Sequence, residues 1–147
     1  MPASGAIKLV DANVWLAISA DGHTHHAKAK DWFNTQAEQD CAMCRVAQMA
    51  LPRHLTNSKI MGVNVQTQAE AWQTHDKLAN DPRVIFLNEP AMMDTAFRGF
   101  TQATSPSHGV WTDAYLAAFA VSSQAQLVTF DQGFGRYAGL DLLVLGS

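Results

Sequence analysis

The sequence predicts an α/β protein, a three-layer α/β/α sandwich around a mostly parallel five-stranded sheet. Short apolar runs of strand length alternate with longer segments in which apolar residues recur at helical spacing. Parallel strands need crossover helices and become buried on both faces, which accounts for this alternation. With 147 residues, 48% of them hydrophobic, we expect one domain over 1–147 with a continuous core.

The first half of the chain predicts two strands and three helices. In order, these are a strand at 7–11, a helix at 13–18, a helix at about 24–38, a strand at 41–44 and a helix at 46–57. Thr24 is expected to cap the second helix, with Ala27, Trp32 and Phe33 pointing inward. Pro52 lies inside the third helix and is expected to bend it.

The second half predicts three further helices and three strands. The capping box Thr67-x-x-Glu70 begins a helix that Asp81-Pro82 stops. A strand at 83–87, a helix around 92–100, a helix at 111–121 and strands at 127–130 and 142–145 follow.

Charge and segment lengths limit the classes of function. Ten Lys and Arg against thirteen Asp and Glu give a formal charge of −3, so a nucleic acid must be held by a local basic face. No apolar stretch reaches the length of a membrane span, and the first eight residues do not resemble a signal peptide. We therefore expect a cytoplasmic protein without membrane contact.

Two other patterns permit metal binding. Cys41 and Cys44 form a C-x-x-C pair, which is compatible with half a zinc site or a redox pair. We interpret both as apolar core thiols, because free cysteine is commonly buried and residues three apart on a strand point to opposite faces. His23, His25 and His26 lack a complete ligand set, so solvation or capping of a helix start is the preferred interpretation.

Three aspartates are expected to meet at one edge of the sheet. Asp11 ends the first strand and Asp131 follows the fourth, while Asp113 opens a helix after the polar loop at 102–108. In open parallel sheets, ligands bind outside the carboxyl ends of the strands. Each aspartate taken singly is also a common turn or helix-start residue. All three, however, lie within apolar segments, which makes a shared role the better interpretation.

Such a group predicts a divalent cation. Carboxylates brought together with partial burial repel one another unless protons or a cation offset their charge. A hard cation with oxygen ligands, Mg²⁺ or Mn²⁺, suits Asp11, Asp113 and Asp131 best. Asn13, Thr112 and Thr129 are candidates for hydrogen bonds that orient these carboxylates.

Three segments together resemble the PIN-domain family, and within it the VapC-type toxins of bacterial toxin–antitoxin pairs. They are Leu9-Val-Asp-Ala-Asn-Val-Trp-Leu16, Trp111-Thr-Asp-Ala-Tyr-Leu-Ala-Ala-Phe-Ala120 and Leu127-Val-Thr-Phe-Asp-Gln-Gly-Phe134. The resemblance extends from about Ile7 to Leu145. It implies a Rossmann-like sandwich, Mg²⁺-dependent RNA cleavage, a homodimer and an inhibitory antitoxin.

One position departs from the family pattern. The family's second acidic residue lies on the helix after the second strand, and the matching position here is Gln48. An amide oxygen can bind a cation or orient its water, but it brings no charge and is not a base near neutral pH. Gln48 is therefore a candidate catalytic residue of reduced strength. A weakened protein that binds RNA or an antitoxin without cutting is the alternative function.

Basic and apolar side chains are candidates for partner contacts. Several basic side chains lie in segments that begin near the expected edge and are candidates for phosphate contacts, although each is also an ordinary surface charge. They are Arg45, Arg53, Lys59 and Arg136, with His54. Trp15, Met92 and Met93 are surplus apolar residues that an antitoxin helix would cover, while a partner Arg or Lys offsets the carboxylates.

Overall fold

The sheet has five strands in the order β3-β2-β1-β4-β5. The computed structural model describes residues 6–146. The strands are β1 (Lys8–Val10), β2 (Cys41–Met43), β3 (Val84–Phe86), β4 (Gln126–Thr129) and β5 (Leu142–Val144). All four neighbouring pairs run parallel, which confirms the predicted sheet.

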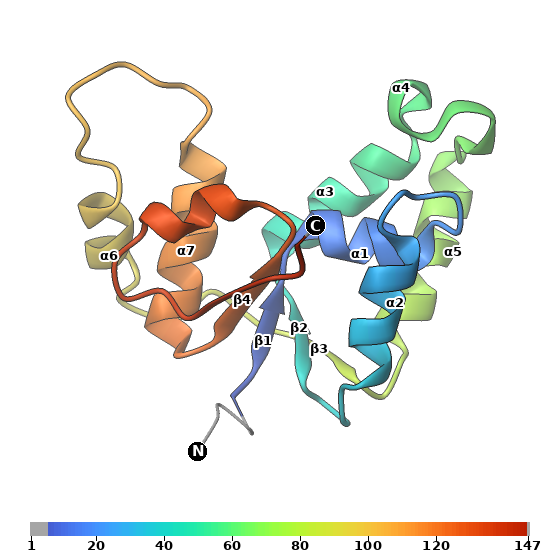
Figure 1. Ribbon diagram of the computed structural model, residues 1–147, viewed down its shortest axis with the longest axis horizontal. Helices are drawn as coiled ribbons and strands as arrows, with labels where there is room; N and C mark the ends of the chain where they lie inside the picture. The colour runs from blue at the N-terminus through green and yellow to red at the C-terminus, as the bar shows by residue number, and fades with distance from the viewer. Residues whose placement is uncertain (1–5, 147) are drawn as a thin grey trace.

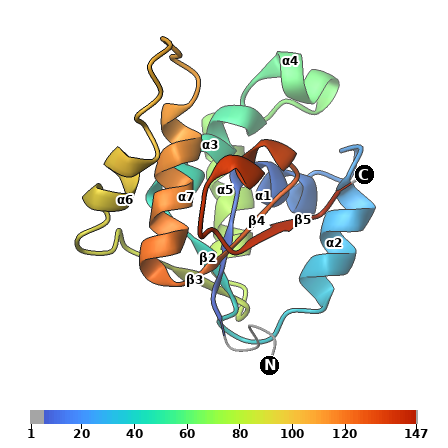
Figure 2. The same ribbon diagram turned by 60° about the vertical axis from the view of Figure 1, so that its left-hand side comes forward.

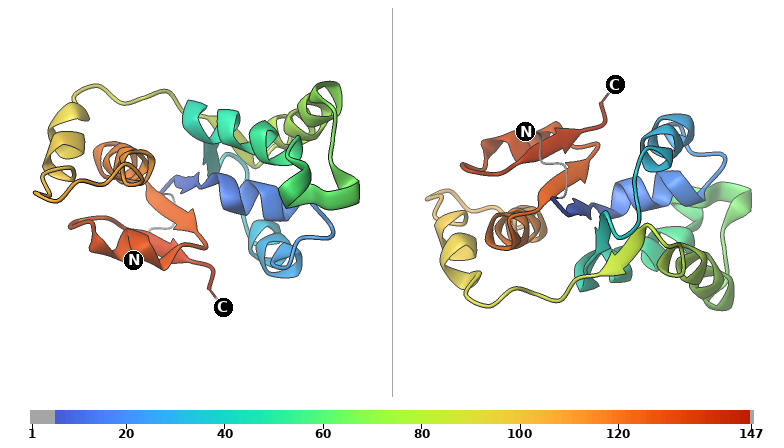
Figure 3. Two further views of the ribbon diagram at one scale, coloured as in Figure 1. Left: turned by 90° about the horizontal axis from the view of Figure 1, so that it is seen from above. Right: turned by 90° about the horizontal axis from the view of Figure 1, so that it is seen from below.

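Helices cover both faces of this sheet. They are α1 (Ala12–Ser19), α2 (His26–Asn34), α3 (Arg45–Leu55), α4 (Ser58–Met61), α5 (Gln68–Ala79), α6 (Asp94–Gly99) and α7 (Trp111–Ser123), with short 3₁₀ helices η1 (Gly62–Asn64) and η2 (Gln132–Arg136). Helices α6 and α7 lie on one side of the strands, and α1, α2, α3 and α5 on the other (Figures 1 and 3). The predicted three-layer architecture is therefore confirmed.

The start of α2 differs from the prediction. The helix begins at His26 and not at Thr24, and its N-cap residue, His25, makes no side-chain capping bond. Because the helix starts later and ends at Asn34, the buried face is formed by Ala29 and Phe33, whereas Ala27 is exposed. Positions four apart share a helix face, so this buried pair indicates which side meets the core.

The segment before α6 also differs. Met92 has a φ of 69° in the left-handed region, which is uncommon for a residue with a side chain and prevents a helix from starting there. The helix therefore begins at Asp94, with Met93 buried before it and Met92 exposed. Only one methionine of the expected surface pair is available for a partner.

Pro52 does not interrupt α3. Proline lacks an N–H and so removes one hydrogen bond, to the carbonyl of Gln48, but its own carbonyl accepts from the backbone N–H of Thr56 at 3.0 Å. Leu51 and Leu55 on the same helix are fully buried, so packing outweighs the missing bond.

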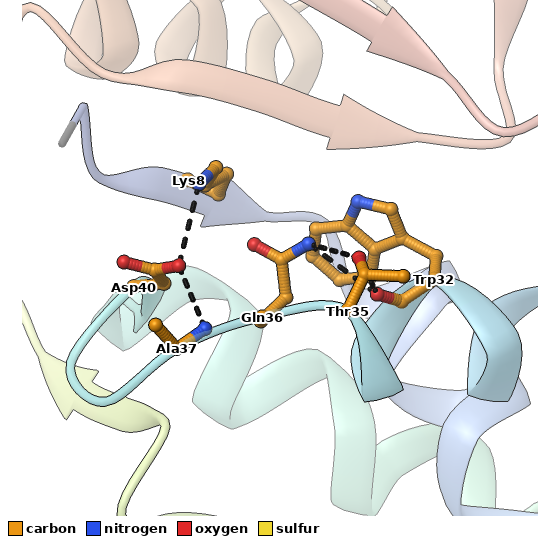
Figure 4. A network of polar contacts seen from close by, with 6 residues as sticks. All are labelled: Lys8, Trp32, Thr35, Gln36, Ala37 and Asp40. Carbon is orange, nitrogen blue, oxygen red and sulfur yellow. Dashed lines mark hydrogen bonds and ion pairs between the residues drawn. The ribbon is translucent and has the colours of Figure 1, made fainter. Parts of the chain in front are cut away.

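At the amino edge of the sheet, a polar network holds the loop that precedes β2. The Asp40 carboxylate accepts from the Ala37 backbone N–H at 2.8 Å and lies 3.5 Å from the Lys8 Nζ (Figure 4). Lys8 also pairs in register with Cys41. Because β1 and β2 are aligned at this edge, their opposite ends reach the carboxyl edge together.

Besides Met93, the core contains Trp15, which we also expected at the surface. Trp15 is fully buried and packs edge-on against Phe33 at 6.1 Å between ring centroids. Cys41 and Cys44 are buried free thiols, and burial raises the pKa of Cys41 to about 12, in agreement with their interpretation as core residues. Within the described part of the chain, no helix combines the length and apolar character needed to cross a membrane.

Candidate metal centre

Asp11 lies at the carboxyl edge of the sheet, between β1 and β4. These strands are neighbours, and the backbone N–H of Asp11 donates to the carbonyl of Val128 at 2.9 Å. Its side chain is the N-cap of α1, where Oδ1 accepts from the Ala12 N–H at 2.7 Å. The second oxygen, Oδ2, accepts from the hydroxyl of Thr129 at 2.8 Å. Each carboxylate oxygen is thereby oriented by one donor.

Thr129 connects Asp11 to the end of β4. It is 0% exposed, and its oxygen also accepts from the Asp131 N–H at 3.0 Å and from the Asn13 side-chain amide at 3.3 Å. Thr129 thus donates to a carboxylate, and Asn13 contacts Thr129 and not a carboxylate. Thr112 is exposed, and within residues 6–146 it makes no hydrogen bond to a carboxylate.

Asp113 and Asp131 face this edge from α7 and from the loop after β4. Asp131 Oδ1 accepts from the Gly133 N–H at 2.8 Å, and the Gly133 carbonyl accepts from Arg136 at 2.9 Å. A Cβ on Gly133 would lie 3.0 Å from the Asp131 carboxylate and 3.1 Å from the Arg136 guanidinium, so the tight turn favours glycine. The turn brings Arg136 Nη2 to 3.8 Å from Asp113 Oδ2.

The three carboxylates influence one another electrostatically. Burial raises the pKa of Asp11, and the charges of Asp113 and Asp131 raise it further against the lowering effect of its hydrogen bonds. Burial and the charge of Asp131 raise the pKa of Asp113, while Arg136 opposes that change. The cluster therefore carries repulsion that a bound cation would relieve.

The available ligand atoms are of the type that a hard divalent cation prefers. All three side chains offer carboxylate oxygens, which Mg²⁺ and Mn²⁺ prefer. Across residues 6–146, however, no three His, Cys, Asp or Glu side chains are grouped closely enough to form a finished metal site. Arg136 instead offsets part of the negative charge through its ion pair with Asp113.

The Gln48 side chain contacts Arg45 and His75 in the structure. Its Oε1 accepts from Arg45, and its Nε2 lies 3.2 Å from His75 Nε2 on α5. With Phe86 of β3, these residues line a separate small pocket. Both polar ends of the amide are therefore engaged by Arg45 and His75.

This placement gives a prediction for Gln48→Glu. The new carboxylate is expected to stay with Arg45 and His75, so Mn²⁺ affinity should remain within about twofold of the wild type, in contrast to the tightening that an added ligand charge produces. Titration calorimetry with Mn²⁺ measures this directly. A clear gain in affinity would show that residue 48 turns toward the cation.

The basic candidates are distributed over several surfaces. Arg45 lies over the ring of Phe86 at 4.9 Å, whereas Arg53 and Lys59 are exposed on α3 and α4. Only Arg136 among these four forms an ion pair with a carboxylate of the cluster within residues 6–146.

Sequence analysis missed one contact near this edge. Tyr115, one helical turn from Trp111 on α7, donates its hydroxyl hydrogen to Glu89 at 2.7 Å. Glu89 follows β3 in the sequence, and no local pattern marks Tyr115, 26 residues later, as its partner. The bond ties the loop after β3 to the helix that carries Asp113.

The chain belongs to the PIN domain family, whose sequence profile matches residues 8–140. It is 37% identical over 144 residues to Ribonuclease VapC41 of Mycobacterium tuberculosis, covering 95% of this chain and 99% of that one. Its fold is similar to VapBC from Salmonella typhimurium, solved bound to DNA (TM-score 0.68, 14% identity, 95% and 98% covered). It is also similar to VapC20 of Mycobacterium tuberculosis, described as a sarcin-ricin loop cleaving toxin (0.66, 14%, 91% and 97%).

Proposed function

We propose that this chain is a divalent-metal-dependent endoribonuclease that acts as the toxin of a toxin–antitoxin pair. The observation that carries the proposal is the half-buried Asp11 carboxylate, which Thr129 orients and whose pKa the charges of Asp113 and Asp131 raise. The 37% identity to a ribonuclease over nearly the whole chain supports the reaction class.

Asp11, Asp113 and Asp131 are the residues that would hold Mg²⁺ or Mn²⁺. The bound ion supplies activation of water for attack on the phosphodiester and stabilisation of charge on the phosphate oxygens. Thr129 holds Asp11 in one orientation, and Arg136 is positioned to move from Asp113 to a substrate phosphate. By family resemblance, the products carry 5′-phosphate and 3′-hydroxyl ends.

The partners are proposed by likeness. Solved relatives include toxin–antitoxin complexes, so we propose a cognate antitoxin, a homodimer and a cytoplasmic location. Trp15 and Met93 are buried and no longer support an antitoxin surface, while Met92 remains exposed. Co-purification from the native host tests for the partner.

Cleavage of an end-labelled single-stranded RNA tests the activity. The purified protein is expected to cut it in Mg²⁺ or Mn²⁺ and to stop when excess EDTA is added. Cutting that continues in EDTA would contradict the metal mechanism. RNA binding without cutting in either metal would favour the weakened protein, the alternative that rests on Gln48 in place of the family's second acidic residue.

A further inference from the structure

A cavity of about 950 Å³ lies beside the candidate metal centre. Its walls come from α6, the loop between α6 and α7, the first turn of α7 and the end of η2. This loop stands above α6 and α7 in Figure 2. The volume is within the range of about 300–1,000 Å³ that is typical of small-molecule sites.

Arg136 joins the cavity to the acidic residues. Its guanidinium lines the cavity and lies 3.8 Å from the Asp113 carboxylate. Trp111, on another wall, precedes Asp113 by two residues in the same helical turn. A ligand in the cavity is therefore next to the place where the proposed reaction occurs, with the positively charged Arg136 guanidinium between the two.

The walls suit a flat aromatic group attached to a phosphate. The rings of Phe100 and Tyr137 lie 5.0 Å apart, and the Arg136 guanidinium covers Tyr137 at 4.6 Å. Trp111, which packs edge-on against Phe97, remains 53% exposed. Hydroxyl groups such as that of Ser105 add hydrogen-bonding capacity, and no Asp or Glu lines this cavity within the described residues.

We propose that this cavity binds one unpaired nucleobase of the RNA, adjacent to the scissile phosphate. The inference rests on the proposed ribonuclease function. The base stacks on the exposed face of Trp111, and Arg136 contacts the phosphate that links this nucleotide to the cleaved bond. Stacking on aromatic side chains is how proteins hold unpaired bases, and it tolerates different base identities.

Binding measured without cleavage tests this proposal. Fluorescence anisotropy in EDTA would follow a labelled single-stranded RNA and a series of the same RNA with one abasic nucleotide at each position. Trp111→Ala is expected to weaken binding roughly tenfold, as loss of one stacking platform does. Trp111→Phe should retain most of the affinity. Trp72→Ala is the matched control, because Trp72 is also 53% exposed but lies on α5, outside this cavity.

The abasic series identifies the stacked base. One abasic position should weaken binding to the wild type and have little further effect in Trp111→Ala, because both changes remove the same contact. An RNA affinity of Trp111→Ala equal to that of the wild type would overturn the proposal. This includes the case in which the variant loses a co-purifying protein, because Trp111 would then contact a protein and not RNA. The proposal would also be overturned if no abasic position were coupled to Trp111→Ala and, in addition, Trp72→Ala lost as much RNA affinity as Trp111→Ala. The same holds if no abasic position were coupled and Trp111→Ala had a lowered unfolding midpoint. Wild-type protein that neither binds nor cuts RNA would reject the ribonuclease function itself.

Discussion

Asp113→Asn is expected to lower RNA cleavage on the order of a thousandfold while the fold remains intact. The substitution removes one of three charges from the proposed cation site, and metal stabilisation of the transition state contributes several kcal/mol. Asp113 is half-buried in the first turn of α7 and has no hydrogen bond that the core requires within residues 6–146. Initial rates on a single-stranded RNA in Mn²⁺ measure the loss.

Asp94→Asn is a matched control for that experiment. Asp94 is also in the first turn of a helix and faces an arginine, Arg98, at 3.9 Å, but it is on α6 and exposed. Its substitution should leave the rate unchanged. The unfolding midpoint should change little in both variants, because partly exposed ion pairs contribute little to stability. Full activity of Asp113→Asn would remove this residue from the site.

Thr129→Val is expected to destabilise the metal-free protein by about 2 to 4 kcal/mol. Valine has the shape of threonine but no hydroxyl, so Asp11 Oδ2 loses its donor, and the backbone N–H of Asp131 loses its acceptor at the buried position 129. Because Asp11 is then oriented only by the Ala12 N–H, Mn²⁺ affinity should fall as well, by about 10- to 100-fold.

Thr129→Ser separates the hydroxyl from the methyl group. Serine keeps the three hydrogen bonds and should lose only about 1 kcal/mol for the missing methyl group. Urea unfolding of both variants, followed by Mn²⁺ titration, gives the two quantities. A valine variant as stable and as tightly binding as the serine variant would show that the hydroxyl does not organise the site.

The fold was predictable because strand patterns and helix signals are local. The capping box of Thr67 and Glu70 is present as expected. The structure pairs β1 with β4 and so brings Asp11 and Asp131 to one carboxyl edge, where the sequence analysis expected the two carboxylates to meet. These predictions needed only periodicity and the position of a polar residue after an apolar run.

The errors arose where tertiary packing decides. Trp15 seemed available for a partner because its helix is apolar on all sides, and only the packing of Phe33 against it shows that it is buried. The contacts of Gln48 depend on His75, 27 residues away, which no local pattern reveals. The sequence does not distinguish Arg136 from the other basic residues, because its contact with Asp113 depends on the turn at Gly133.

Titration calorimetry with Mn²⁺ tests the central claim, that Asp11, Asp113 and Asp131 together form one binding site for a divalent cation. Wild-type protein is expected to bind Mn²⁺ with heat that EDTA abolishes, and the Asp→Asn variant at each of the three positions should lose that binding while retaining the wild-type circular dichroism spectrum. Equal Mn²⁺ affinity in the wild type and all three variants would contradict the account.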